Sequence, residues 1–101
     1  KGKVSKNGLG VEEALIEAGS GVSLKRLNDY TYIQSLGGLE VFETSLNTIG
    51  GSFYITPELR QKSQQVKVLN SQDQVQIKQE NELSRKDIIL SVVFKLKSRK
   101  I

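Results

Sequence analysis

The feature that most constrains the fold of this chain is a set of three glycine clusters. They are Gly19-Ser20-Gly21, Gly37-Gly38 and Gly50-Gly51. Glycine is favoured where a backbone turns sharply or approaches a ligand closely, because it has no Cβ atom. The clusters therefore predict junctions between elements, and they mark places where a ligand could reach the backbone.

The segment between the first two clusters is predicted to be a helix. Val11–Ala18 is expected to form a short strand that leads into the first cluster. Ser23 is a suitable N-cap and Gly37 a suitable C-cap, so the helix is expected to span Ser23–Leu36. The apolar residues at roughly helical spacing are Leu24, Leu27, Tyr30 and Ile33.

The second half of the chain is predicted to contain mainly antiparallel strands. Leu39–Leu46 fits either a short helix or an irregular turn. Thr56-Pro57-Glu58 predicts the start of a short helix that ends near Lys62, with proline at its first position.

Beyond that helix, apolar and polar residues alternate. Val66 and Val68 are separated from Val75 and Ile77 by Ser71-Gln72-Asp73, which predicts a hairpin. A polar loop is expected over Glu80–Lys86. Ile88–Leu96 is the strongest predicted strand, and one of its faces carries Val92, Phe94 and Leu96.

Together these elements predict an α+β fold, in which a small antiparallel sheet has flanking helices, formed by residues 1–101 as a single domain. The chain has no cysteine and no histidine. Disulfides, thiolate metal sites and the usual zinc and triad chemistries therefore lack their commonest parts, so no metal ligand is expected. No apolar run is long enough to span a bilayer, and Lys1–Gly10 does not resemble a signal peptide. Because methionine is absent, we expect the chain to be a piece of something longer.

The net charge of +4 comes largely from basic residues near the two ends of the chain. They are Lys1, Lys3, Lys6, Lys95, Lys97, Arg99 and Lys100. Lys95 and Lys97 alternate with Phe94 and Leu96, as on the solvated face of a half-buried strand. A phosphate-binding patch is the alternative, but nucleic-acid and membrane partners are not expected.

The order of the glycine segments resembles a known family. Ala18-Gly19-Ser20-Gly21-Val22 is followed by Leu36-Gly37-Gly38-Leu39-Glu40, by Asn47-Thr48-Ile49-Gly50-Gly51, and by the strand ending at Leu96. This order resembles the second half of the PCMH-type FAD-binding domain of the UDP-N-acetylenolpyruvoylglucosamine reductases, the MurB-type UDP-N-acetylmuramate dehydrogenases. The resemblance extends from Leu15 to Leu96.

The resemblance implies a cofactor site at Asn47, Thr48, Ile49, Gly50 and Gly51, the segment that would lie nearest the flavin and its pyrophosphate. A glycine-rich loop allows backbone N–H groups to reach a phosphate or a flavin edge. Taken alone, Gly50-Gly51 fits a tight turn before a strand better than a cofactor site. The sequence departs from the family at Leu46 and Asn47, where the family has proline and glycine.

The resemblance also implies an activity for the parent protein. NADPH would reduce FAD, and the reduced flavin would reduce the enolpyruvyl group of a nucleotide sugar, in the cytoplasm, during synthesis of peptidoglycan precursors. The family's Tyr-Arg motif is missing before the last strand; Ser84 and Arg85 stand there and are interpreted as an exposed loop. No catalytic residue is therefore assigned, and the chain by itself is expected to be inactive. The alternatives are a non-catalytic scaffold or binding module and another FAD-dependent oxidase of the same superfamily.

Overall fold

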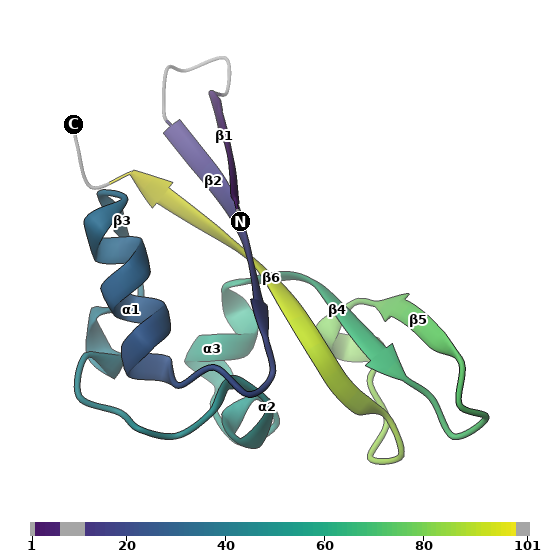
Figure 1. Ribbon diagram of the computed structural model, residues 1–101. Helices are drawn as coiled ribbons and strands as arrows, with labels where there is room; N and C mark the ends of the chain where they lie inside the picture. The colour runs from purple at the N-terminus through teal and green to yellow at the C-terminus, as the bar shows by residue number, and fades with distance from the viewer. Residues whose placement is uncertain (1, 7–11, 99–101) are drawn as a thin grey trace.

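The structure, a computed structural model, describes residues 2–6 and 12–98. Within these residues, six strands form one antiparallel sheet, with the order β1-β2-β6-β4-β5 and with β3 paired to β6 (Figure 1). The strands are β1 Gly2–Lys6, β2 Glu12–Gly19, β3 Leu36–Gly37, β4 Ser63–Leu69, β5 Val75–Lys78 and β6 Ile88–Ser98. The predicted α+β class with a small antiparallel sheet is confirmed.

Short helices connect the strands. They are α1 Leu24–Ile33, the 3-10 helix η1 Glu40–Phe42, α2 Ile49–Ser52, α3 Pro57–Gln61 and the 3-10 helix η2 Glu80–Glu82. Figure 1 shows the three α-helices grouped on one side of β6, with the β4–β5 hairpin on the other side. None of the helices in the described ranges is long and apolar enough to cross a membrane.

The core lies between the helices and one face of the sheet. On that face, Ala14 pairs with Leu96 and Ile16 pairs with Phe94, and all four side chains are buried. The strands and the helices contribute further buried apolar side chains, which are Leu24, Leu27, Leu36, Leu39, Phe42, Ile49, Phe53, Leu59, Val66, Val68, Ile89 and Val92. One continuous apolar layer therefore joins the central strands β2, β6 and β4 to the helices.

The pairing of the long strand β6 with β4 shifts register at two places, one of them a bulge at Leu90. The pairing with β4 passes from Ser91 to Ile89 and gives Leu90 no partner. This extra residue lets Ile89 and Val92 both face the core, although they are three positions apart. Val92, Phe94 and Leu96 share the buried face, as the alternation in the sequence predicted.

Helix α1 differs from its prediction in length and in the face that it buries. It ends at Ile33 and not at Leu36, because Ser35 takes a left-handed conformation with φ of 60°. Leu36-Gly37 then pairs with β6 as a strand, so Gly37 is not the C-cap. The predicted N-cap is confirmed, since the Ser23 hydroxyl accepts a hydrogen bond from the Arg26 N–H.

The apolar residues of α1 repeat every three positions, which moves them around the helix by about 60° at each step. Ile33 consequently lies on the face opposite Leu24 and is 76% exposed. The buried face is completed by Asn28 and Thr31, and the Thr31 hydroxyl donates to the Asn28 carbonyl at 2.9 Å. The predicted apolar face of this helix is therefore confirmed at Leu24 and Leu27 and wrong at Tyr30 and Ile33.

Most other elements agree with the sequence. The hairpin β4–β5 and the proline at the start of α3 are confirmed. The ambiguous stretch Leu39–Leu46 contains the single turn η1, and the expected loop Glu80–Lys86 begins with η2. Strand β1 was not predicted, and Val11 at the start of the predicted first strand lies outside the described residues.

The other face of the sheet carries charges. Lys95 and Lys97 are exposed there, as the alternation predicted, and the Lys95 ammonium lies 3.2 Å from the Glu13 carboxylate. Glu17 on the same face accepts a hydrogen bond from the Ser91 hydroxyl. These contacts favour a solvated face rather than a phosphate-binding patch.

The two faces of α1 give a matched test of this packing. Leu27→Ala is expected to lower the free energy of unfolding by about 2–5 kcal/mol, because it opens a cavity in the core. Ile33→Ala on the exposed face is expected to change it by less than about 0.5 kcal/mol. Urea denaturation followed by circular dichroism measures both, and equal losses would contradict the orientation of α1.

Candidate functional site

The predicted cofactor segment lies against the turn that follows β2. The Gly50 N–H donates to the Ser20 carbonyl and the Ile49 N–H donates to the Val22 carbonyl, each at 2.9 Å. The Leu24 N–H at the start of α1 donates in turn to the Asn47 carbonyl at 2.8 Å. Two of the three glycine clusters therefore meet through backbone hydrogen bonds.

Thr48 begins the short helix α2. Its hydroxyl accepts a hydrogen bond from the Gly51 N–H at 3.1 Å, which is the usual arrangement of an N-cap. The N–H groups of Ile49, Gly50 and Gly51 thus all have acceptors inside the protein. None of the three is available to a ligand in this conformation.

Close contacts with Ser20 and Thr48 explain why positions 50 and 51 are glycine. A Cβ atom on Gly50 would lie 2.9 Å from the Cβ atom of Ser20 and 3.3 Å from its carbonyl oxygen. A Cβ atom on Gly51 would lie 2.9 Å from the Thr48 hydroxyl. Gly21 differs, because a Cβ atom there would have nothing within 4 Å.

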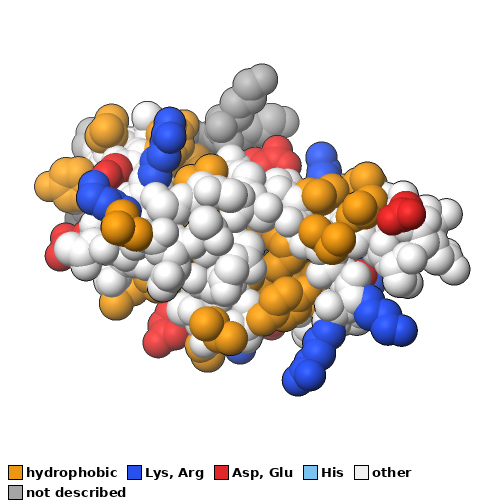
Figure 2. All heavy atoms as spheres, turned by 60° about the horizontal axis from the view of Figure 1, so that its bottom comes forward, with side chains coloured by type: hydrophobic (Ala, Val, Ile, Leu, Met, Phe, Trp, Pro, Cys, Tyr) orange, Lys and Arg blue, Asp and Glu red, His pale blue; other side chains and the backbone are white. Residues whose placement is uncertain are grey.

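An open groove with a volume of about 410 Å³ lies where these two turns meet the start of β6. Its lining residues are Ser20, Gly21, Thr48, Gly50, Gly51, Tyr54, Asp87, Ile88 and Ile89. Figure 2 brings the lower side of Figure 1 forward, and it shows hydrophobic side chains beside a broad area of backbone and uncharged polar groups. The lining residues make the groove mixed in polarity, with glycine, hydroxyl, carboxylate and apolar side chains.

The structure brings together only part of the predicted cofactor segment. Thr48, Gly50 and Gly51 line the groove. Ile49 does not line it, because its side chain is fully buried in the core. Asn47 does not line it either, and its carbonyl is used by α1.

A hydrogen-bonded network that the sequence did not predict borders the groove. The Tyr54 hydroxyl lies 3.1 Å from the carbonyl of Ser84 and 3.3 Å from that of Asp87, which joins α2 to the loop before β6. The buried Asp87 carboxylate accepts hydrogen bonds from the Lys78 ammonium at 2.8 Å and from the Ser84 N–H at 2.9 Å. A single carboxylate just before the strongest strand was the available signal in the sequence.

The charge at this position is negative. The hydrogen bond from Lys78, followed by that from the Ser84 backbone, lowers the pKa of Asp87 below its ordinary value. Partial burial, followed by the charge of Asp87, raises the pKa of Tyr54, so the phenol stays protonated and donates. Ser84 and Arg85 are exposed, in agreement with their interpretation as a loop.

Arg60 contacts the segment that follows α2. Its guanidinium donates to the carbonyls of Phe53 and Tyr54, which lie just after α2. It also lies 3.7 Å from the Glu80 carboxylate. These contacts hold the segment that carries Tyr54 against α3.

The groove fits one part of the predicted cofactor better than another. The pyrophosphate of FAD requires N–H donors or cations, but the nearest N–H groups are occupied, and the Lys78 ammonium is already paired with Asp87. The site does not fit a pyrophosphate. The groove offers a flat ring system apolar contact from Ile88 and Ile89.

The described residues contain no group of three or more histidine, cysteine, aspartate and glutamate side chains that could hold a metal ion. No family model matches the chain, and a search of curated proteins finds no match either.

Two glycines of the site offer a matched test of the backbone contact. Gly50→Ala is expected to lower the free energy of unfolding by about 1–3 kcal/mol, because its Cβ atom would overlap Ser20. Gly21→Ala is expected to leave stability unchanged or to raise it by up to about 1 kcal/mol, since its surroundings are open. Thermal and urea unfolding of the two variants measure the difference. An unchanged free energy of unfolding in Gly50→Ala would contradict the close contact with Ser20.

The buried carboxylate generates a prediction about acid stability. Its pKa is lower in the folded state, so its contribution is present above its ordinary pKa of about 3.8 and is lost as the pH falls toward the folded-state pKa. Asp87→Asn is expected to be less stable than the parent protein at pH 7. Urea denaturation between pH 5 and about pH 2 should show a shallower loss of stability for the variant. Parallel curves would contradict this role of Asp87.

Proposed function

We propose that this chain forms part of the FAD-binding domain of an oxidoreductase that resembles the UDP-N-acetylmuramate dehydrogenases, and that the groove binds the flavin ring. The observation that supports this proposal is the meeting of Gly21 with Thr48, Gly50 and Gly51 in one open groove. Two turns thereby present backbone without large side chains, which permits close approach of a planar ligand.

The chemistry of the groove favours the ring over the rest of the cofactor. Ile88 and Ile89 supply apolar contact at one wall, and Thr48 supplies a hydroxyl at the other. Phosphate is disfavoured because the N–H groups of Ile49 and Gly50 already donate to carbonyls of the protein. The pyrophosphate is accordingly assigned to other segments of the same polypeptide.

Bound FAD would supply the redox chemistry, with NADPH as the reductant and a nucleotide sugar as the substrate of the parent enzyme. The residues of this chain would hold one face of the ring. We assign no catalytic residue to the chain and propose that it is inactive by itself. We also propose that the parent enzyme works in the cytoplasm.

A non-catalytic binding or scaffold module is the second candidate. The observation that favours it is the internal use of the N–H groups of Ile49, Gly50 and Gly51, which leaves the turn stable without any ligand. In that case the glycines serve the packing of α2 against β2 alone.

Separate parts of the cofactor distinguish the two candidates. Riboflavin is expected to shift the backbone amide NMR signals of Gly21, Thr48 and Ile89, and to change tyrosine fluorescence through Tyr54, which lines the groove. ADP, which carries the pyrophosphate without the ring, is expected to leave these signals unchanged. A response to neither compound would favour the scaffold, and a response to ADP alone would contradict binding of the ring.

A pair of glycine variants locates the response. Gly21→Leu is expected to abolish the riboflavin shifts, because its side chain would fill the groove. Gly19→Leu is the matched control, since Gly19 has equally open surroundings but does not line the groove. Equal loss of binding in both variants would contradict the proposed position of the ring.

A further inference from the structure

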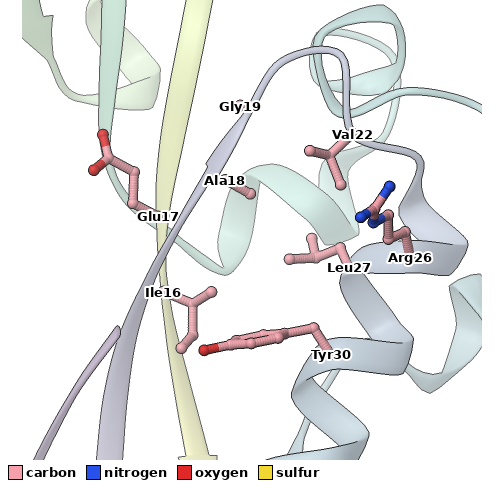
Figure 3. A pocket seen from close by; sticks show the side chains of 8 residues that line it. All are labelled: Ile16, Glu17, Ala18, Gly19, Val22, Arg26, Leu27 and Tyr30. Carbon is pink, nitrogen blue, oxygen red and sulfur yellow. The ribbon is translucent and has the colours of Figure 1, made fainter. Parts of the chain in front are cut away.

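A second pocket lies on the other side of the turn after β2, between β2 and α1. It has a volume of about 230 Å³, and it is lined by Ile16, Glu17, Ala18, Gly19, Val22, Arg26, Leu27 and Tyr30. It shares no lining residue with the groove described above. Figure 3 shows it from close by.

The walls of this pocket are mainly apolar. Ile16 and Leu27 belong to the buried core, and Ala18 and Val22 pack against that core. Figure 3 shows the ring of Tyr30 extending from α1 toward Ile16 on β2, while the Glu17 side chain points away from the pocket. The pocket therefore combines an aromatic side chain with aliphatic ones, which suits a small ring.

The rim of the pocket carries one positive charge. The Arg26 guanidinium lies beside Val22 at the start of α1 (Figure 3), and it has no ion pair or hydrogen bond to another described residue. Lys25, the preceding residue, is instead paired with Asp29 at 2.9 Å. Arg26 is thus a planar cation beside an apolar pocket, free to bind a carboxylate through two parallel hydrogen bonds.

The N-terminus of α1 does not itself provide this charge recognition. The N–H groups of Leu24, Lys25 and Arg26 donate to Asn47, Ser45 and Ser23 respectively. An anion at this place therefore depends on the Arg26 side chain. The hydroxyl of Tyr30 has no partner among the described residues and offers a second polar contact.

We propose that the pocket between β2 and α1 binds a small aromatic carboxylate. The ring lies between Tyr30 and the aliphatic wall, and the carboxylate binds Arg26. The volume of about 230 Å³ accommodates a single ring. This site is independent of the proposed flavin groove.

Benzoate is a suitable probe, and amide NMR of the whole chain is a suitable measurement. Benzoate is expected to shift the signals of Ala18, Val22 and Leu27 saturably, with a dissociation constant on the order of 1 mM. Benzamide, which keeps the ring without the charge, and acetate, which keeps the charge without the ring, are expected to bind at least about tenfold more weakly.

Two charge variants complete the test. Arg26→Gln is expected to weaken benzoate binding at least about tenfold and to leave benzamide unchanged. Lys25→Gln removes one positive charge from the adjacent position and is expected to leave both unchanged. Equal weakening by the two variants, or no saturable shift up to about 20 mM benzoate, would overturn the proposal.

Discussion

The rest of the structure depends on the backbone contact between the turn after β2 and the segment that begins α2. Gly50 and Ile49 donate to carbonyls of that turn, and this contact places α2 directly on the end of the central strands. An N–H group left unbonded in such a place would cost about 1–3 kcal/mol, so the two turns are stable together and not apart. Because Gly50 has no Cβ atom, the two backbones approach closely enough to form these bonds.

Two of the open sites among the described residues lie beside this contact. The turn after β2 stands between them, with the glycine-bordered groove on one side and the pocket of α1 on the other. They differ in their charged groups, since the groove is bordered by Asp87, which is paired with Lys78, and the pocket has the Arg26 guanidinium at its rim.

The parts of the fold that follow from local chemistry could be predicted from the sequence. The alternation in β6, the hairpin and the proline start of α3 depend on neighbouring residues only. The end of α1 could not be predicted, because Ser35 adopts a left-handed conformation that glycine or asparagine usually takes. The order of the glycine segments predicted a cofactor site at Asn47–Gly51, and Thr48, Gly50 and Gly51 of that segment line the groove. It could not show that the N–H groups of Ile49 and Gly50 are used internally, nor that Asp87 joins the groove, because Val22, Ser20 and Asp87 lie far from this segment in the chain.

Amide hydrogen exchange tests the central contact most directly, because it measures how rarely the hydrogen bond of each N–H group opens. The N–H groups of Ile49 and Gly50 are predicted to exchange as slowly as those of the buried strand residues Val92 and Phe94. The N–H groups in the turn between β4 and β5 supply the fast reference. Exchange of Ile49 and Gly50 at the rate of that turn would contradict the account, because the segment would then be an open loop and not a structural junction.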